Sequence, residues 1–185
     1  SRIWPKLHKG FHRESINSEI SQIISDTYSK YTAYFEHFFE NGHFYTLKDQ
    51  DGNRLAFAQF HKVRWEIQRL PGKLGGVQVK LLPYIPLLNK LIQPKSHTFL
   101  VPDMVCNPSG DIRDVQKLFE SALAYEKVHS LLWWNDTRDE HYIKAQASFN
   151  WGLLHKLIGV AAVDVVFRGD FEPKQPVFVV AFDMV

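Results

Sequence analysis

Two side chains on one apolar segment could exchange a proton with a substrate. Residues 98–106 are apolar and β-branched enough to predict a strand, which carries Asp103 and follows His97. If side chains alternate along it, Asp103 shares a face with Val101 and Val105, and apolar surroundings raise the pKa of a carboxyl group. Asp103 is therefore the first candidate for a general base and His97 the second, although a buried acid can also cap a loop.

A turn and a helix come next. Asn107-Pro108-Ser109-Gly110 predicts a turn, and an amphipathic helix is expected from about Asp111 to Lys127. Unpaired amides at the start of a helix, together with the helix dipole, favour a bound anion. The same residues suit an ordinary helix cap made by Ser109 or Asp111. Both interpretations are open at this point.

A second strand and helix carry a candidate acid. Val128–Asn135 predicts an apolar strand, and the helix after it carries Tyr142 and ends near Ser148-Phe149. Successive side chains of a strand point to opposite faces, so Trp133 and Trp134 are expected to diverge. One ring then belongs to the core, and the other packs there too or lines a cleft.

Earlier elements must support these segments. Apolar residues three or four positions apart predict a helix over Ser15–Glu40, with a break near Ser25-Asp26 as an alternative, and Asn41-Gly42 ends it. His43–Lys48 and Arg54–Trp65 predict a hairpin, because an Asp-Gly pair lies between two alternating runs. Both faces of this hairpin carry apolar side chains, so both should be covered.

The two ends of the chain are expected to differ. Residues 1–14 predict an irregular lead-in, and residues 15–185 a single domain. Ala161–Arg168 and Pro176–Val185 predict two closing strands.

The proline-rich stretch 70–96 contains an apolar patch, Leu81–Leu88. Prolines prevent a regular helix through it, although Leu87–Ile92 could form a short one. The patch is too apolar for a solvated loop, so we expect it to dock on the domain, on a partner or over a ligand.

From about Ser15 to Val185, the order of elements resembles the GNAT superfamily of acyl-CoA N-acyltransferases. Asn135 after a strand, with Tyr142 seven residues later on the next helix, carries much of the likeness. The resemblance implies an α/β fold whose mixed, mostly antiparallel sheet has flanking helices. No counterpart of the family's first strand is expected in residues 1–14. That absence, with Ser1 at the start, predicts a chain cut from a longer protein, such as a tandem of two domains.

The resemblance also implies a cofactor site for acetyl-CoA or another acyl-CoA. The family's counterpart of residues 98–106 is bulged and leaves a cleft for the pantetheine arm, and Pro102 suits either a bulge or an edge strand. The implied cofactor-binding residues are Met104, Val105, Cys106, Ser109, Gly110, Asp111, Ile112, Arg113 and Asn135. Tyr142 would protonate the departing thiolate, or would be a half-buried helix residue without that role.

Three functions follow from this resemblance. The first is transfer of an acyl group from acyl-CoA to a small-molecule amine, with Tyr142 as acid and Asp103 or His97 accepting a proton. The second is a non-catalytic GNAT-like module that dimerises or docks on another domain through Leu81–Leu88. A third is an acyl-chain binder that uses the same patch as a lid. The sequence does not identify an acceptor or an acyl group.

Composition excludes several classes of protein. Of the 185 residues, 45% are apolar and 23% are charged, as in an ordinary globular domain. The net charge is only +2 and no Lys/Arg stripe concentrates it, so no nucleic-acid partner is expected. No apolar run reaches the roughly 18 residues of a membrane span.

Cysteine and histidine usage adds two expectations. A single cysteine, Cys106, excludes an intrachain disulfide and favours a reducing compartment, so we expect a cytoplasmic protein. The nine histidines are scattered, and no metal site is predicted from them. Nothing in the sequence brings Cys106 and His129 together as a nucleophile pair.

Overall fold

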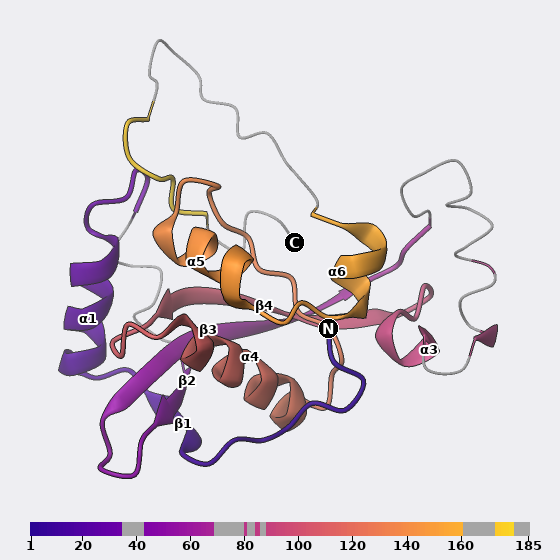
Figure 1. Ribbon diagram of the computed structural model, residues 1–185, viewed down its shortest axis with the longest axis horizontal. Helices are drawn as coiled ribbons and strands as arrows, with labels where there is room; N and C mark the ends of the chain where they lie inside the picture. Colours follow the sequence, from indigo (N-terminus) through magenta and orange to yellow (C-terminus); the bar gives the residue numbers. More distant parts are fainter. Residues whose placement is uncertain (35–42, 69–79, 81–83, 86–87, 161–172, 180–185) are drawn as a thin grey trace.

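The computed structural model describes residues 1–34, 43–68, 80, 84–85, 88–160 and 173–179 (Figure 1). Four antiparallel strands form one sheet in the order β1-β2-β3-β4. The strands are β1 (Phe11–Ser15), β2 (His43–Lys48), β3 (Arg54–Trp65) and β4 (His97–Cys106). The helices are α1 (Ser18–Tyr28), α3 (Leu88–Leu91), α4 (Ile112–Glu126), α5 (Glu140–Ser148) and α6 (Leu153–Ile158). The expected α/β class, a largely antiparallel sheet with flanking helices, is confirmed at this level.

The predicted hairpin is present with the predicted bounds. β2 and β3 pair antiparallel, with Phe44 opposite Gln59. In the loop, the Asp49 side chain accepts hydrogen bonds from the amides of Asp51 and Asn53, and Gly52 has a φ of 88°. A glycine adopts that left-handed conformation without strain, so the Asp-Gly pair fixes this turn locally.

β1 is the main element that the sequence analysis missed. Phe11–Ser15 pairs antiparallel with β2, so the irregular lead-in expected over residues 1–14 and the expected lack of a first strand are wrong there. The Glu14 carboxylate binds Arg54 at 3.0 Å, and Arg54 and Thr46 hold its pKa at about 2 against the effect of burial. This strand is held by its backbone ladder and by ion pairs rather than by an apolar stripe.

The first helix is shorter than predicted. α1 begins at Ser18, where the Asn17 side chain accepts the amide of Ile20 at 2.9 Å, and it runs unbroken to Tyr28. Beyond it the chain leaves the helix because Thr32 pairs in parallel with Val177. The expected helix over Ser15–Glu40 is therefore wrong at its start and after Tyr28, whereas residues 35–42, with the expected stop at Asn41-Gly42, lie outside the described residues.

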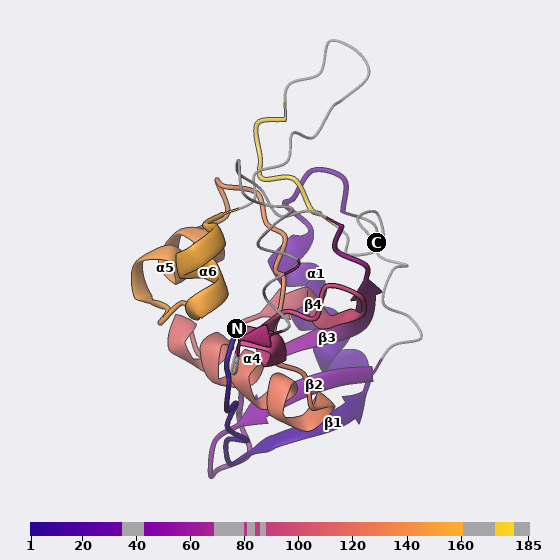
Figure 2. The same cartoon turned by 90° about the vertical axis from the view of Figure 1, so that its right-hand side faces the viewer.

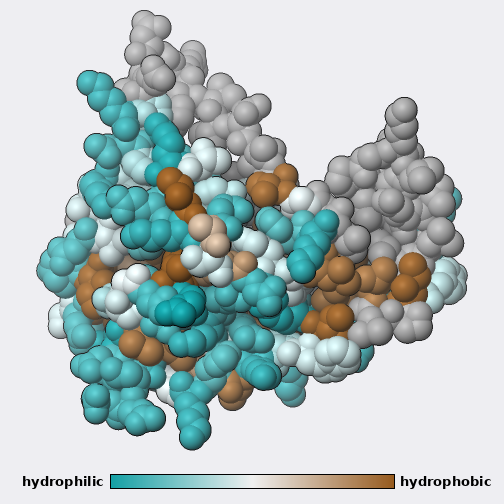
Figure 3. All heavy atoms as spheres, viewed as in Figure 1, coloured by the Kyte–Doolittle hydropathy of each residue, from teal (hydrophilic) through white to brown (hydrophobic). Residues whose placement is uncertain are grey.

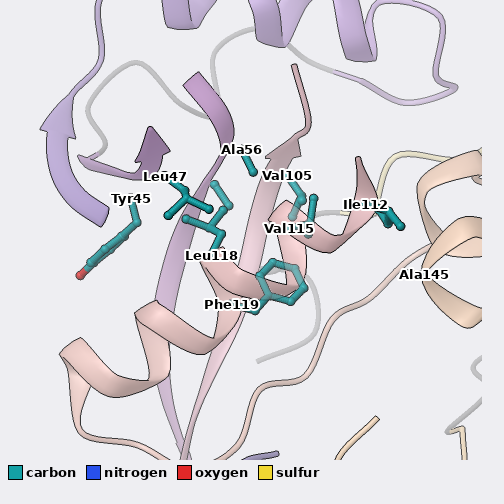
Figure 4. Close-up of a cluster of buried hydrophobic side chains, with 10 residues drawn as sticks. Tyr45, Leu47, Ala56, Val105, Ile112, Val115, Leu118, Phe119 and Ala145 are labelled. Carbon is teal, nitrogen blue, oxygen red and sulfur yellow. The ribbon is translucent and has the colours of Figure 1, made fainter. Parts of the chain in front are cut away.

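Helices cover both faces of the sheet, as the hairpin pattern predicted. α1 packs against Phe44, Phe57 and Met104 on one face. α4 packs on the other face, where Val115 and Leu118 are fully buried against β2, β3 and β4 (Figures 2 and 4). Burying a side chain such as Leu118 contributes roughly 1.5–3 kcal/mol. The two-sided core buries side chains of β4 on both of its faces.

β4 meets the segment Val128–Asn135 at only one point. Leu100 donates its amide to the Ser130 carbonyl at 3.1 Å and accepts the Leu132 amide at 2.9 Å, in a parallel bridge. Alternate residues of a strand turn their backbone groups to the same side, so Pro102 faces that segment without a donor. The strand predicted over Val128–Asn135 is thus reduced to one bridge, because Pro102 of β4 has no backbone amide to donate the next hydrogen bond.

A bulge reverses the side-chain alternation of β4. Gln59 pairs with Asp103 and Phe57 pairs with Cys106, so two steps along β3 correspond to three along β4. Within this extra step, Met104 has a φ of 49°. Because of the extra residue, Val105 packs toward α4, whereas Val101 packs with Phe99 on the opposite face. The expectation that Asp103 lies between Val101 and Val105 on one face is wrong for Val105.

Helices α4 and α5 lie where they were predicted, and α3 matches the short helix expected within Leu87–Ile92. α6 was not predicted.

In the expected Leu81–Leu88 patch, Tyr84 and Ile85 are exposed, and residues 81–83 and 86–87 lie outside the described part. The closing strand expected over residues 161–168 also lies outside it, and of the one expected over Pro176–Val185 the described part, 176–179, forms only the bridge between Val177 and Thr32. Among the described helices, none is long and apolar enough to cross a membrane.

Candidate functional site

A pocket of about 390 Å³ lies beside α4, α5 and α6 at the Val128–Asn135 side of the sheet. We call it the aromatic pocket. Its described aromatic residues are Trp65, Phe99, Phe119, Trp133, Trp134, Tyr142, Phe149 and Trp151. Hydrophobic residues gather on the surface at the same end of the molecule, near α6 and α3 (Figure 3). Volume and lining are both within the range of small-molecule sites.

The aromatic rings support one another. Trp133 and Phe149 lie nearly parallel at 6.3 Å, and Phe119 meets the edge of Trp133 at 5.2 Å. Trp151 stacks on the His155 imidazole at 4.4 Å with an angle of 18°. Each contact of this kind limits ring rotation, so the pocket has flat walls in fixed positions.

Two polar side chains of α5 face this pocket. Tyr142 and Gln146 stand one helical turn apart and both line it. The Asp139 side chain caps the helix by accepting the amides of His141 at 2.6 Å and Tyr142 at 3.2 Å. Within the described residues, neither the Tyr142 hydroxyl nor the Gln146 amide group makes a hydrogen bond. Both groups therefore retain their hydrogen-bonding capacity at the pocket wall.

His97 lines the same pocket from the start of β4. Its Nε2 lies 3.2 Å from the Ser130 hydroxyl oxygen, and its ring stacks on Phe99 at 5.5 Å. Burial lowers the pKa of His97 below its usual value. The imidazole is consequently neutral at neutral pH and can accept a proton at a nitrogen that is not protonated.

The charged side chains at this pocket are already paired. Among the described lining residues these are Arg2 and Glu120. The Glu120 carboxylate lies 3.7 Å from the Arg2 guanidinium and 3.1 Å from the His8 Nε2. No charged side chain of the described lining is thus left for a ligand of opposite charge.

A second, much smaller cavity lies where β4 and the segment Val128–Asn135 separate. Its volume is about 10 Å³, room for about one water molecule. Asp103, Met104, Val105 and Asn135 contribute to its lining. Trp133 and Trp134 line both cavities, so the tryptophan pair stands between them. The ring clusters confirm the predicted divergence, since Trp133 packs toward α4 and Trp134 toward Phe99.

Internal hydrogen bonds occupy several polar groups around this small cavity, although the buried Asn135 Nδ2 has none within the described residues. The Tyr28 hydroxyl donates to the Val105 carbonyl at 2.7 Å, and the Asp103 carboxylate accepts the Met104 amide at 3.0 Å. The His61 Nε2 lies 3.9 Å from the Asp103 carboxylate. Cys106 is completely buried, and burial raises the pKa of its thiol to about 12, so it is no nucleophile at neutral pH.

The turn before α4 is closed in the same way. The Ser109 amide donates to the Leu55 carbonyl and the Gly110 amide to the Asn107 carbonyl. The Arg113 amide donates to the Asp111 carboxylate at 3.0 Å, and the Asp111 amide donates to the Ser109 hydroxyl oxygen. Hydrogen bonds with Arg113 lower the pKa of Asp111 to about 2. The helix-cap interpretation of this turn is confirmed, with Asp111 as the cap.

The predicted site residues therefore fall into separate groups. His97 and Tyr142 share the aromatic pocket, whereas Asp103, Met104, Val105 and Asn135 line the small cavity. Cys106 lies in the core beneath α1. Ser109, Gly110, Asp111, Ile112 and Arg113 form the turn and the start of α4.

Sequence reasoning missed Gln146 and the aromatic residues Phe119, Phe149 and Trp151. For Gln146 the signal was its i+4 spacing from Tyr142, which puts both on one face of the helix. In comparisons with protein-family models, curated proteins and solved structures, no match was found. The described residues contain no group of three or more His, Cys, Asp or Glu side chains that could hold a metal ion.

Proposed function

We propose that this protein is a GNAT-like N-acyltransferase that transfers an acyl group from an acyl-CoA, such as acetyl-CoA, to an amine. One observation carries the proposal: β4 has a bulge and separates from the parallel segment that it meets at Leu131. Beside this separation lies α5, whose Tyr142 side chain lines the aromatic pocket. In the family that Ser15–Val185 resembles, such a separation receives the pantetheine arm.

The order of the other elements supports this proposal. α1 connects β1 to β2, and three further strands follow in antiparallel pairing. After β4, α4 leads to a segment that is parallel to β4 at Leu100 and Leu131. In chain order β1 corresponds to the family's first strand, which supports extending the proposed likeness to residue 11.

The proposed reaction needs one acid and one base. The amine nitrogen attacks the thioester carbonyl, the C–N bond forms, and the C–S bond breaks. The Tyr142 hydroxyl donates a proton to the leaving thiolate, and the neutral His97 imidazole accepts the proton that the amine loses. Asp103, on the far side of the tryptophan pair, is a less direct base. The products are an amide and the free coenzyme A thiol.

A specific observation favours a second candidate, a non-catalytic GNAT-like module. The amides of the turn before α4 and the Val105 carbonyl are bonded within the protein, where the enzyme would offer them to coenzyme A. Such a module would act by docking or dimerisation, and the exposed Tyr84 and Ile85 belong to the patch expected to do so.

Titration calorimetry with acetyl-CoA separates the two candidates. The enzyme should give measurable heat at submillimolar acetyl-CoA, and Tyr142→Phe should lower the rate of acyl transfer by about 10²–10⁴-fold without weakening that binding. No heat at millimolar acetyl-CoA would contradict the enzyme. A drop in oligomeric mass by light scattering in Ile85→Asp would then support the docking module.

A further inference from the structure

We infer that the aromatic pocket binds a flat, uncharged aromatic group with a polar substituent, and that Tyr142 and Gln146 bind this substituent. The binding itself requires no coenzyme. Assigning the bound group to the acceptor rests on the proposed acyl transfer, and that acceptor would enter the pocket with its amine uncharged.

The shape of the pocket favours a flat ligand. Its volume of about 390 Å³ accommodates one or two fused rings together with a short substituent. The nearly parallel Trp133 and Phe149 rings and the Trp151–His155 stack present flat faces from different elements. Aromatic groups gain more from such faces than aliphatic groups of equal area, because ring pairs attract beyond the burial of their surface.

The electrostatics favour a neutral ligand. Arg2 and Glu120 neutralise each other, and His97 is held neutral by burial. A carboxylate placed among the remaining aromatic residues would lose its hydration without gaining an ion pair, and an ammonium group would recover only part of its lost hydration from cation–π contact with the ring faces. The pocket should therefore discriminate against charged ligands of either sign.

Tyr142 and Gln146 then fix the orientation of the ligand. A phenol hydroxyl both donates and accepts, and so does a carboxamide. Neither group has a hydrogen bond within the described part of the chain, and both line the pocket from one face of α5. A substituent such as an amide or a hydroxyl can satisfy both at once, whereas a wholly apolar ligand leaves them without partners.

The protein contains its own reporter for this test. Four of its five tryptophans, Trp65, Trp133, Trp134 and Trp151, line the pocket, and the fifth, Trp4, lies outside it with 71% of its surface exposed. Emission excited at the red edge of tryptophan absorption, in the Trp4→Phe variant, thus comes only from tryptophans that line the pocket. The four probes are benzamide, cyclohexanecarboxamide, benzoate and benzylammonium.

We expect benzamide to change the emission with a millimolar dissociation constant, as suits so small a ligand. The other three probes should bind about tenfold more weakly or not at all, a difference set by lost stacking or by unpaired charge. Equal binding of all four probes, or no response to benzamide at tens of millimolar, would overturn the inference.

Two variants test the polar contact. Gln146→Leu should weaken benzamide by about five- to tenfold, and the matched exchange on the exposed side of α5, Lys144→Leu, should leave the affinity unchanged. Gln146→Glu should reverse the preference, so that benzylammonium binds better than benzamide. Circular dichroism verifies that each variant is folded. An unchanged benzamide affinity in both Gln146 variants would remove Gln146 from the site and overturn the inference.

The outcomes are independent of those for acyl transfer. A benzamide response with no heat from acetyl-CoA would support the aromatic site and contradict the proposed acyltransferase activity. Heat from acetyl-CoA without a benzamide response would overturn only the aromatic site.

Discussion

The two cavities on either side of Trp133 and Trp134 differ in how their polar groups are used. At the end of β4 and in the turn before α4, carbonyls, amides and carboxylates bond to one another, as in the Tyr28–Val105 and Asp111–Arg113 pairs. In the aromatic pocket, the Tyr142 hydroxyl and the Gln146 amide make no hydrogen bond within the described residues. Among the described residues, the small cavity leaves the buried Asn135 amide nitrogen and Trp134 indole nitrogen without a partner, whereas the aromatic pocket leaves the Tyr142 and Gln146 side chains, on one helix face, with capacity for a ligand.

The difference shows that the backbone shape of a site and the availability of its polar groups for a ligand are separate properties. In the proposed acyltransferase, the separation of β4 from its neighbour would take the pantetheine arm, yet the cavity there has a volume of only about 10 Å³ and carbonyl and amide groups around it are already bonded. Replacing an internal hydrogen bond by one to a ligand gains little, because one bond is exchanged for another. Substitutions at four positions test whether the closed region and the open pocket are independent, from the largest expected effect to the smallest.

Trp133→Ala should have the largest effect, because this ring contacts both regions. Loss of its packing on Phe119 and Phe149 should lower the free energy of unfolding by about 3 kcal/mol, measured by urea denaturation. Trp4→Ala, at an exposed position, is the control and should change it by less than about 0.5 kcal/mol. Similar losses in both variants would mean that Trp133 is no wall between the two cavities.

Tyr28→Phe should affect only the closed region. Removing the hydroxyl leaves the buried Val105 carbonyl without its donor, and the free energy of unfolding should fall by about 1–3 kcal/mol in urea denaturation. The affinity for benzamide should not change. An altered benzamide affinity would show that the two regions are coupled and break the comparison.

Asp111→Ala and Asp111→Asn separate the cap from the charge. Asp111→Ala removes the cap of α4 and should lower the melting temperature by about 3 °C, whereas Asp111→Asn keeps a capping oxygen and should preserve it. If acetyl-CoA binds at this turn, Asp111→Asn should also bind it more tightly, since a carboxylate no longer faces the pyrophosphate. Calorimetry on both variants measures the binding, and weaker binding by Asp111→Asn would place the coenzyme elsewhere.

His97→Asn should have the smallest effect, visible as a pH dependence. The unfolded chain takes up a proton near pH 6.5, whereas burial lowers the pKa of His97 in the folded protein. The unfolded state therefore binds more protons between pH 7 and 5, and the free energy of unfolding falls as the pH falls.

The His97→Asn exchange keeps a partner for Ser130 but removes this proton. In this variant the free energy of unfolding should fall less steeply as the pH falls. The difference in slope should be a fraction of about 1.4 kcal/mol per pH unit, which is the largest slope that one proton can give. His61 and His141, whose pKa values are also lowered by burial, keep part of the slope. Urea denaturation at several pH values measures the slope of the free energy of unfolding against pH. Identical slopes in the wild type and in His97→Asn would contradict a neutral, buried His97.

Much of the fold could be predicted because local signals agreed with tertiary packing. The Asp-Gly loop fixed the β2–β3 hairpin, and the Asp111 cap and apolar stripe located α4. β1 escaped notice because its pattern is polar, with Glu14 held by Arg54 and Thr46, partners far away in the chain. The end of α1 was missed for a similar reason, since Thr32 pairs with Val177 and no local signal reveals that pairing.

The site was less predictable than the fold. Tyr142 and His97 were found as single residues, but their shared pocket depends on how α4, α5 and α6 pack. The bulge at Met104 could not be located from the alternation of β4, and it moved Val105 to the other face. Residues that act through shape, such as Phe149 and Trp151, have no sequence signal beyond their apolar character.

Pro102 has a consequence for the folding chain. Until Val128–Asn135 docks, β4 presents an open strand edge, and exposed edges recruit strands from other molecules. A proline interrupts the row of amide donors beyond Leu100, so a second copy of the chain cannot form a continuous ladder there. The residue that separates β4 from its neighbour thereby also acts as a gatekeeper against aggregation.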